Sequence, residues 1–234
     1  MPGRWGVLNV DGSQMGCYVS APADSGRFAG LLVAQHAPGV DSFLQTMCDR
    51  LAAEGFVALA PDLYHRDPGK ADPPLERMAR LRDANVVRDF TTAYEHLRTL
   101  PNVDVARLGI TGFCMGGRVA YLMATHLRGL RAAVVFYGGN IMVPWGEGEA
   151  PFDRTAQIEC PMLGLFGEED TNPSPADVAK IDAELTRLGK PHEFHMYPNA
   201  GHAFMNWEQP PRYRQHAAEG AWPKCVAWFK RHLA

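Results

Sequence analysis

The sequence predicts an α/β protein with a mostly parallel sheet, helices on both faces and an antiparallel hairpin at the N-terminus. From Phe28 to the C-terminus, short apolar runs of strand length alternate with longer stretches whose apolar residues have helical spacing. Several apolar runs are continuous, which is typical of strands buried on both faces of a parallel sheet. Because no stretch has the composition of a linker, we expect residues 1–234 to form a single domain.

The first expected element is a hairpin. Val7–Val10 and Met15–Ser20 are short strand-like runs on either side of Asp11-Gly12, a pair that favours a tight turn. The two strands should extend one edge of the sheet in the antiparallel sense. The remaining strands are expected from their apolar or aromatic composition at Phe28–Ala34, Phe56–Ala60, Val105–Thr111, Ala132–Tyr137, Met162–Gly167 and Glu193–Tyr197.

Helices are expected between these strands, where apolar residues recur three or four positions apart. Ser174 is expected to cap one of them, and Gly55 and Gly189 follow two predicted C-termini. The expected helices are Asp41–Glu54, Leu75–Leu100 with one possible break, Arg118–Thr125, Ser174–Leu188 and Arg212–Leu233. We expect Leu63–Pro74 to cross the top of the sheet as a loop, and Ile141–Gln157 to be irregular.

Composition narrows the class of protein. A net charge of −3 gives no indication of a nucleic-acid or membrane surface. The sequence has neither a long apolar span nor the pattern of a signal peptide, so we expect a cytoplasmic protein. Its five cysteines are odd in number and lack CxxC spacing, which argues against a disulfide framework and a zinc site: Cys17, Cys48, Cys114, Cys160 and Cys225.

One of these cysteines lies in a motif that links a strand to a helix. In Gly112-Phe113-Cys114-Met115-Gly116, a residue able to act as a nucleophile is flanked by glycines two positions away on each side. This is the pattern of the nucleophile elbow in the α/β-hydrolase fold, where a sharp turn holds the nucleophile above the sheet. The alternative is a glycine-rich turn around a buried, inert cysteine.

Two further polar residues follow predicted strands in the chain order that α/β-hydrolases use, nucleophile, acid and histidine. A thiol is mostly protonated at neutral pH, so Cys114 needs a base, and His202 is the candidate. Asp170 could hold the other imidazole nitrogen and so fix its tautomer. The amides of Met115 and Ala37 are expected to bind the oxyanion of a tetrahedral intermediate. Alone, Asp170 and His202 could equally be ordinary loop residues.

Five short blocks extend the pattern over almost the whole chain. They are Gln35-x-x-x-Gly39-Val40, Pro61-Asp62-Leu63-Tyr64-x-Arg66, Gly112-Phe113-Cys114-Met115-Gly116-Gly117, Gly167-x-x-Asp170 and Ala200-Gly201-His202-Ala203-Phe204. Together they resemble the dienelactone hydrolase (carboxymethylenebutenolidase) family. The resemblance implies a Cys-His-Asp triad at Cys114, His202 and Asp170. It also implies hydrolysis of a lactone or ester through an acyl-thiol intermediate, with no metal or cofactor.

Some positions depart from the family's pattern. His36 stands where the resemblance implies a glutamate that helps to deprotonate the cysteine, so we expect His36 to shape the oxyanion turn or, as a second possibility, to take a proton. Asn206 stands where the resemblance implies an arginine that binds a substrate carboxylate. For a second such arginine the candidates are Arg77, Arg80 and Arg82; the spacing does not choose among them, and we take Arg80 as the working candidate.

The remaining pocket walls are expected to be aromatic and apolar, as a small-ester pocket requires. Tyr64, Trp145 in the Ile141–Trp145 loop, and Phe204 or Trp207 are the candidates. The alternative for the two tryptophans is that they anchor loops.

We therefore expect a hydrolase of a small ester or enol-lactone, with a small-molecule substrate, no nucleic-acid or membrane partner, and a monomeric or small homo-oligomeric state. Two alternatives stay open at this point. One is a general carboxylesterase or thioesterase of neutral substrates, and the other is a non-hydrolytic sensor with a reactive thiol at Cys114.

Overall fold

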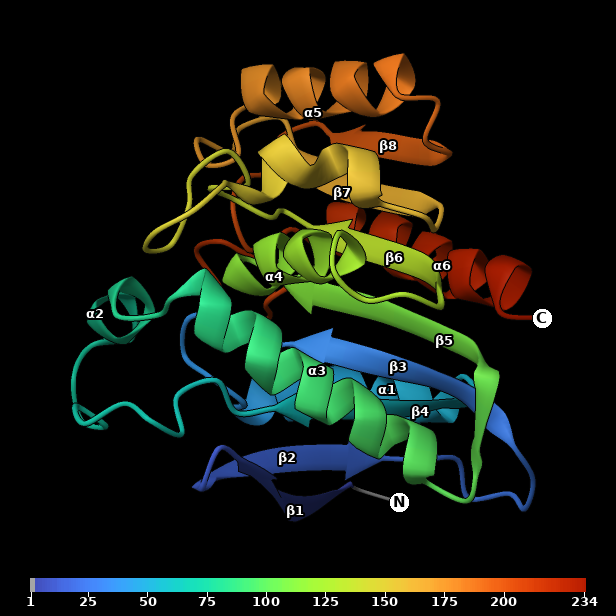
Figure 1. Ribbon diagram of the computed structural model, residues 1–234. Helices are drawn as coiled ribbons and strands as arrows, with labels where there is room; N and C mark the ends of the chain where they lie inside the picture. Colours follow the sequence, from blue (N-terminus) through green and yellow to red (C-terminus); the bar gives the residue numbers. More distant parts are fainter. Residues whose placement is uncertain (1–2) are drawn as a thin grey trace.

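The computed structural model describes residues 3–234, and these contain one sheet of eight strands in the order β1-β2-β4-β3-β5-β6-β7-β8 (Figure 1). The hairpin of β1 (Arg4–Val10) and β2 (Ser13–Ser20) forms one edge, and β2 pairs antiparallel with β4 (Phe56–Pro61). All other pairings are parallel. The parallel strands beside β4 are β3 (Phe28–Ala34), β5 (Val103–Phe113), β6 (Leu130–Phe136), β7 (Met162–Gly167) and β8 (His192–Tyr197).

Helices cover both faces of the sheet, so the predicted fold class is confirmed (Figure 1). One face carries α1 (Ser42–Ala53) and α6 (Gln215–His232). The opposite face carries α3 (Asp83–Thr99), α4 (Met115–Ala124), the 3₁₀ helix η1 (Pro151–Gln157) and α5 (Pro175–Arg187).

The strands serve both layers because successive side chains point to opposite faces. In β3, Leu32 and Ala34 belong to the core beneath α3 and α4, whereas Leu31 and Val33 belong to the core beneath α1 and α6. These side chains are fully buried, which explains why the sequence of β3 is a continuous apolar run.

Three expected helices differ in their bounds by three residues or more. The stretch from Leu75, where one break was considered possible, is two helices, α2 (Pro74–Ala79) and α3, and Asp83 at the start of α3 pairs with a residue of α4. The helix expected from Arg118 begins at Met115. The last helix starts at Gln215 rather than Arg212, since the amide of Arg214 donates to the Phe204 carbonyl. The stretch expected to be irregular from Ile141 ends in η1.

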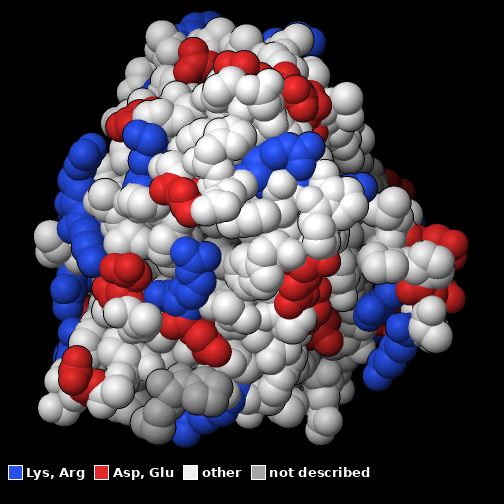
Figure 2. Space-filling model, turned by 180° about the vertical axis from the view of Figure 1, so that it is seen from behind, with Lys and Arg blue, Asp and Glu red and all other residues white. Residues whose placement is uncertain are grey.

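The surface is of mixed charge. Acidic and basic side chains are interspersed on the side of the molecule opposite to that of Figure 1 (Figure 2), in keeping with 23 Lys and Arg against 26 Asp and Glu. Among the helices of residues 3–234, none is sufficiently long and apolar to span a bilayer.

Candidate active site

The turn at Cys114 is an elbow between β5 and α4. Its sharpness depends on glycine, since a Cβ on Gly112 would lie 2.1 Å from the Gly116 carbonyl oxygen, and a Cβ on Gly116 would lie 2.1 Å from that of Ala34. Cys114 itself has a φ of 58°, a strained value for a residue with a side chain. Its amide donates to the Phe136 carbonyl at 3.1 Å, which ties the elbow to the neighbouring strand.

His202 and Asp170 come from the loops after β8 and β7 and form a hydrogen-bonded pair. The Nδ1 of His202 lies 2.8 Å from Oδ2 of Asp170, whose side chain is 1% exposed. The two loops are tied together, because the amide of Glu169 donates to the Ala200 carbonyl at 2.9 Å. A Cβ on Gly167 would lie 2.2 Å from the same carbonyl oxygen, so the close approach requires glycine there.

The thiol of Cys114 faces His202, and the two groups shift one another's pKa in opposite directions. Burial raises the pKa of Cys114, but the hydrogen bond and charge of His202, with the amides of Met115 and Ala37, outweigh burial and lower it. Burial likewise lowers the pKa of His202, but Asp170 and the thiolate outweigh it and raise that pKa to about 10. The arrangement therefore favours a thiolate beside an imidazolium.

The two amides expected to bind an oxyanion both interact with the sulfur of Cys114 and help to lower its pKa. The amide of Met115 is at the N-terminus of α4, and the amide of Ala37 is in the turn after β3. That turn is closed by a hydrogen bond of 2.9 Å from the Gly39 amide to the His36 carbonyl.

The imidazole of His36 is paired with Asp41. Its Nε2 lies 2.7 Å from Oδ1 of Asp41, and its ring packs on Phe43 with the ring centroids 5.1 Å apart. Asp41 also accepts a hydrogen bond from the Leu44 amide and so caps α1. Of the two roles considered for His36, this arrangement favours a brace for the oxyanion turn.

A cavity of about 730 Å³ opens above Cys114. Its lining residues come from the loops at the C-terminal ends of the parallel strands and from α2. Most of its walls are apolar, and Gln209 and Arg212 contribute polar groups. The apolar walls come from α2 and its approach and from the loop after β6: Pro73, Pro74, Leu75, Met78 and Trp145.

A buried ion pair supports the part of the cavity wall that Trp145 forms. Arg118, fully buried in the first turn of α4, binds Asp83 with both terminal nitrogens, at 2.6 and 2.9 Å. The same guanidinium donates to the carbonyls of Asn140 and Val143, and its carbon lies 3.9 Å from the centroid of the Trp145 ring. Trp145 therefore both lines the cavity and anchors its loop, so the two roles considered for it are combined.

Of the residues expected to bind substrate, His36 and Trp145 line this cavity and the others do not. Tyr64 is 1% exposed and lies behind the oxyanion turn. Arg80 is paired with Asp67 and Asp72.

The remaining two predicted contacts, Phe204 and Asn206, are also buried away from the cavity. Phe204 supports Tyr137, with the ring centroids 5.0 Å apart. The side chain of Asn206 accepts a hydrogen bond from the Glu208 amide and so stabilises its own loop.

Several residues with a place in the site were missed, and three of them show why. Tyr137 packs edge-on against the imidazole of His202, with centroids 5.3 Å apart, and it directly ends a predicted strand, which was an available signal. Arg118 could not be recognised, because its partner Asp83 is distant in sequence. Arg212 was assigned to a helix that in fact begins three residues later.

No group of three His, Cys, Asp or Glu side chains within residues 3–234 is arranged to hold a metal ion.

Comparison with known proteins gives a consistent result. Residues 15–233 match the model of the dienelactone hydrolase family. A protein of Methylorubrum extorquens provisionally named carboxymethylenebutenolidase is 34% identical over 226 residues, covering 92% of this chain and 76% of that protein. A crystal structure from Klebsiella pneumoniae, provisionally named dienelactone hydrolase, has a TM-score of 0.88 at 30% identity, covering 98% of this chain and 99% of that one.

A more distant relative, from a Bradyrhizobium species, is provisionally named 2-oxo-3-(5-oxofuran-2-ylidene)propanoate lactonase. It is 28% identical over 235 residues, covering 98% of this chain and 94% of that protein. The resemblance noted in the sequence is thereby confirmed, and the chain is a hydrolase of ester or lactone bonds that belongs to the dienelactone hydrolase family.

Proposed function

We propose that this protein hydrolyses a small ester or lactone through an acyl-thiol intermediate on Cys114, with His202 as the acid–base group and Asp170 as its orienting partner. The observation that carries the proposal is the position of His202, which bonds Asp170 through Nδ1 and leaves Nε2 for the thiol. This is the relation between nucleophile, base and orienter on which triad catalysis depends.

In the first half of the reaction, the Cys114 thiolate attacks the carbonyl carbon, and the carbonyl electron pair moves onto oxygen. The amides of Met115 and Ala37 bind that oxyanion. The C–O bond of the ester then breaks, and the imidazolium of His202 gives its proton to the departing alkoxide. In a lactone the alkoxide stays attached to the acyl group.

In the second half, His202 takes a proton from a water molecule, and the hydroxide attacks the thioester. The tetrahedral intermediate uses the same two amides and then expels the Cys114 thiolate, releasing the carboxylic acid. The imidazolium and thiolate are regenerated together. Asp170 holds His202 in place and stabilises the imidazolium in both halves.

Turnover of p-nitrophenyl acetate by Cys114→Ala tests the proposal. We expect hydrolysis by the variant to be indistinguishable from the uncatalysed rate, with an unchanged circular-dichroism spectrum, and acid quenching of the wild type to trap one acetyl group on the peptide that contains Cys114. Cys48→Ala, in the buried face of α1, is the matched control and should retain activity. Wild-type activity in Cys114→Ala would overturn the proposal.

The substrate could be neutral or acidic. A general esterase of neutral substrates is therefore the second candidate function. It is favoured because Arg77 and Arg80 are engaged with Asp67, and Arg82 with backbone carbonyls, so none of them lines the cavity. Arg212 does line it, and it forms no ion pair within residues 3–234.

A matched pair of aryl esters, one neutral and one with a terminal carboxylate, separates the two candidates. If the carboxylate is recognised by Arg212, Arg212→Gln should raise KM for the acidic ester and leave the neutral one unchanged. Equal effects on both esters would favour the general esterase.

A further inference from the structure

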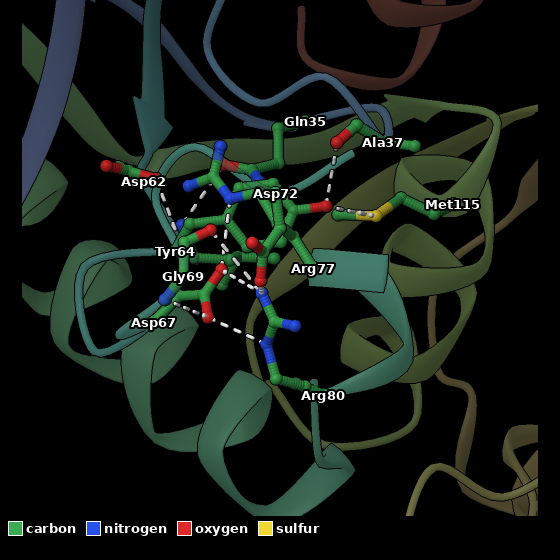
Figure 3. A network of polar contacts seen from close by, with 11 residues as sticks. Gln35, Ala37, Asp62, Tyr64, Asp67, Gly69, Asp72, Arg77, Arg80 and Met115 are labelled. Atoms are coloured by element: carbon green, nitrogen blue, oxygen red, sulfur yellow. Dashed lines mark hydrogen bonds and ion pairs between the residues drawn. The ribbon is translucent and has the colours of Figure 1, made fainter. Parts of the chain in front are cut away.

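Tyr64 is a buried side chain that the steps above do not use. It follows β4 and is 1% exposed. Its hydroxyl donates to the Ala37 carbonyl at 2.8 Å and lies 3.6 Å from Sδ of Met115 (Figure 3). One hydroxyl therefore contacts both residues whose amides face the sulfur of Cys114.

The hydrogen bond from the Tyr64 hydroxyl helps to fix the backbone conformation of Ala37. The peptide that carries the Ala37 N–H has the carbonyl of His36 at its other end, and this carbonyl accepts from the Gly39 amide at 2.9 Å. The next peptide joins Ala37 to Pro38 and has no N–H, so its only polar atom is the carbonyl that Tyr64 holds. Both peptide planes beside the Ala37 Cα are thus fixed, and with them the direction of its N–H.

The ring of Tyr64 is itself held by Arg77, which is anchored in turn by Asp67 (Figure 3). The guanidinium carbon of Arg77 lies 4.1 Å from the centroid of the Tyr64 ring, and Nε of Arg77 binds Asp67 at 3.0 Å. Arg80 binds the same carboxylate, at 2.8 and 3.1 Å. The hydrogen bonds of these two arginines lower the pKa of Asp67 to about 2, so the carboxylate stays charged.

Two other uses for Tyr64 do not fit its surroundings. It does not line the cavity, so it is not placed to contact substrate. Burial raises its pKa well above the ordinary value, so the hydroxyl keeps its proton and does not serve as a base.

We propose that Tyr64 is a positioning residue of the oxyanion hole, which fixes the direction of the Ala37 N–H donor through its hydroxyl. The inference rests on the proposed function, because it requires that an oxyanion forms at Cys114. Its energetic value comes from preorganisation, since a donor that is already aimed at the oxyanion need not be reoriented during the reaction.

Tyr64→Phe tests the inference, since it removes the hydroxyl and keeps the ring beneath Arg77. We expect kcat for p-nitrophenyl acetate to fall about tenfold with KM nearly unchanged, because the lost interaction acts on the transition state. Tyr94→Phe is the matched control: the Tyr94 hydroxyl also donates to a backbone carbonyl, that of Arg128, at 2.8 Å, but lies in α3 away from the cavity.

Alkylation of Cys114 by iodoacetamide separates positioning from general damage to the site. This displacement at carbon uses the thiolate but forms no oxyanion. Measured at a pH where the thiol is fully ionised, the alkylation rate of Tyr64→Phe should equal that of the wild type while its acylation rate falls. Arg77→Leu, which removes the group above the ring, should show the same split with a smaller loss.

The inference is overturned if Tyr64→Phe acylates as fast as Tyr94→Phe, or if its acylation and alkylation rates fall by the same factor. Should Tyr64→Phe fail to fold, equal losses of acylation and alkylation in Arg77→Leu would overturn it as well. Failure of the proposed function gives a different result, because the wild type itself would then show no acylation of Cys114.

Discussion

Two histidines line the same cavity, and each is paired with an aspartate at nearly the same distance. The Nδ1 of His202 lies 2.8 Å from Asp170, and the Nε2 of His36 lies 2.7 Å from Asp41. Judged by the pair alone, either could be an acid–base group. The surroundings of the second nitrogen distinguish them, since the thiolate of Cys114 interacts with His202 and not with His36.

The two aspartates differ in the same way. The side chain of Asp170 is 1% exposed and binds His202. That of Asp41 is 29% exposed and, besides binding His36, caps α1 by accepting a hydrogen bond from the Leu44 amide. The His202–Asp170 pair lies where the loops after β8 and β7 meet, whereas the His36–Asp41 pair lies at the N-terminus of α1. A histidine–aspartate pair therefore indicates a catalytic base only when its free nitrogen faces a nucleophile.

The largest expected effect separates the two histidines. His202→Gln should lower kcat/KM for p-nitrophenyl acetate by about 10⁴-fold, because glutamine cannot take up and release a proton beside Cys114 as the imidazole does. His36→Gln, the matched substitution, should stay within about tenfold of the wild type, since it affects only the shape of the oxyanion turn. Equal losses in the two variants would remove the distinction between the histidines.

A smaller effect is expected at the first aspartate. Asp170→Asn keeps the shape of the side chain but favours the wrong tautomer of His202 and removes the charge that stabilises its imidazolium. We expect kcat to fall by roughly 10²- to 10³-fold with KM little changed, as measured by steady-state kinetics. A variant with wild-type kcat would show that His202 is oriented by other groups, such as Tyr137.

The smallest expected effect concerns stability rather than rate. Asp41→Ala removes the N-cap of α1 and should lower the free energy of unfolding by about 1 kcal/mol, measured by urea denaturation. Asp41→Asn is the control, because asparagine is an equally good N-cap, and it should be nearly as stable as the wild type. Neither variant should lose more than about tenfold in kcat/KM; a loss as large as that of Asp170→Asn would contradict the comparison.

Much of the fold could be predicted, because most of the central parallel strands contain long apolar runs and the turns between elements contain glycine and proline. The sequence allowed for a break within Leu75–Leu100, but its position, between α2 and α3, could not be predicted. Apolar spacing continues across it, and the residue at the start of α3, Asp83, is paired with Arg118, which is far away in the chain. Sequence pattern reports local preference and cannot reveal a tertiary contact of this kind.

The candidate triad could be predicted because each member comes within a few residues of the end of a strand, and strand ends meet at one edge of a parallel sheet. The cavity wall could not, because it depends on which way each loop side chain turns. Tyr64 and Phe204 are aromatic residues beside the site, yet both point into the core. Arg212 lines the cavity from a turn that the sequence pattern had assigned to a helix.

The most direct test of the account is the pH dependence of Cys114 alkylation by iodoacetamide. The other cysteines provide little background, because burial raises the pKa of each of them: Cys17, Cys48, Cys160 and Cys225. As the pH falls through the pKa of Cys114, its thiolate takes a proton and the alkylation rate falls.

We predict a midpoint below the ordinary thiol value of about 8.5 in the wild type and in His36→Gln, and a higher midpoint in His202→Gln, where only the amides of Met115 and Ala37 still oppose the effect of burial. A wild-type midpoint at or above the ordinary value, or one that His202→Gln leaves unchanged, would contradict the claim that Cys114 and His202 form the reactive pair.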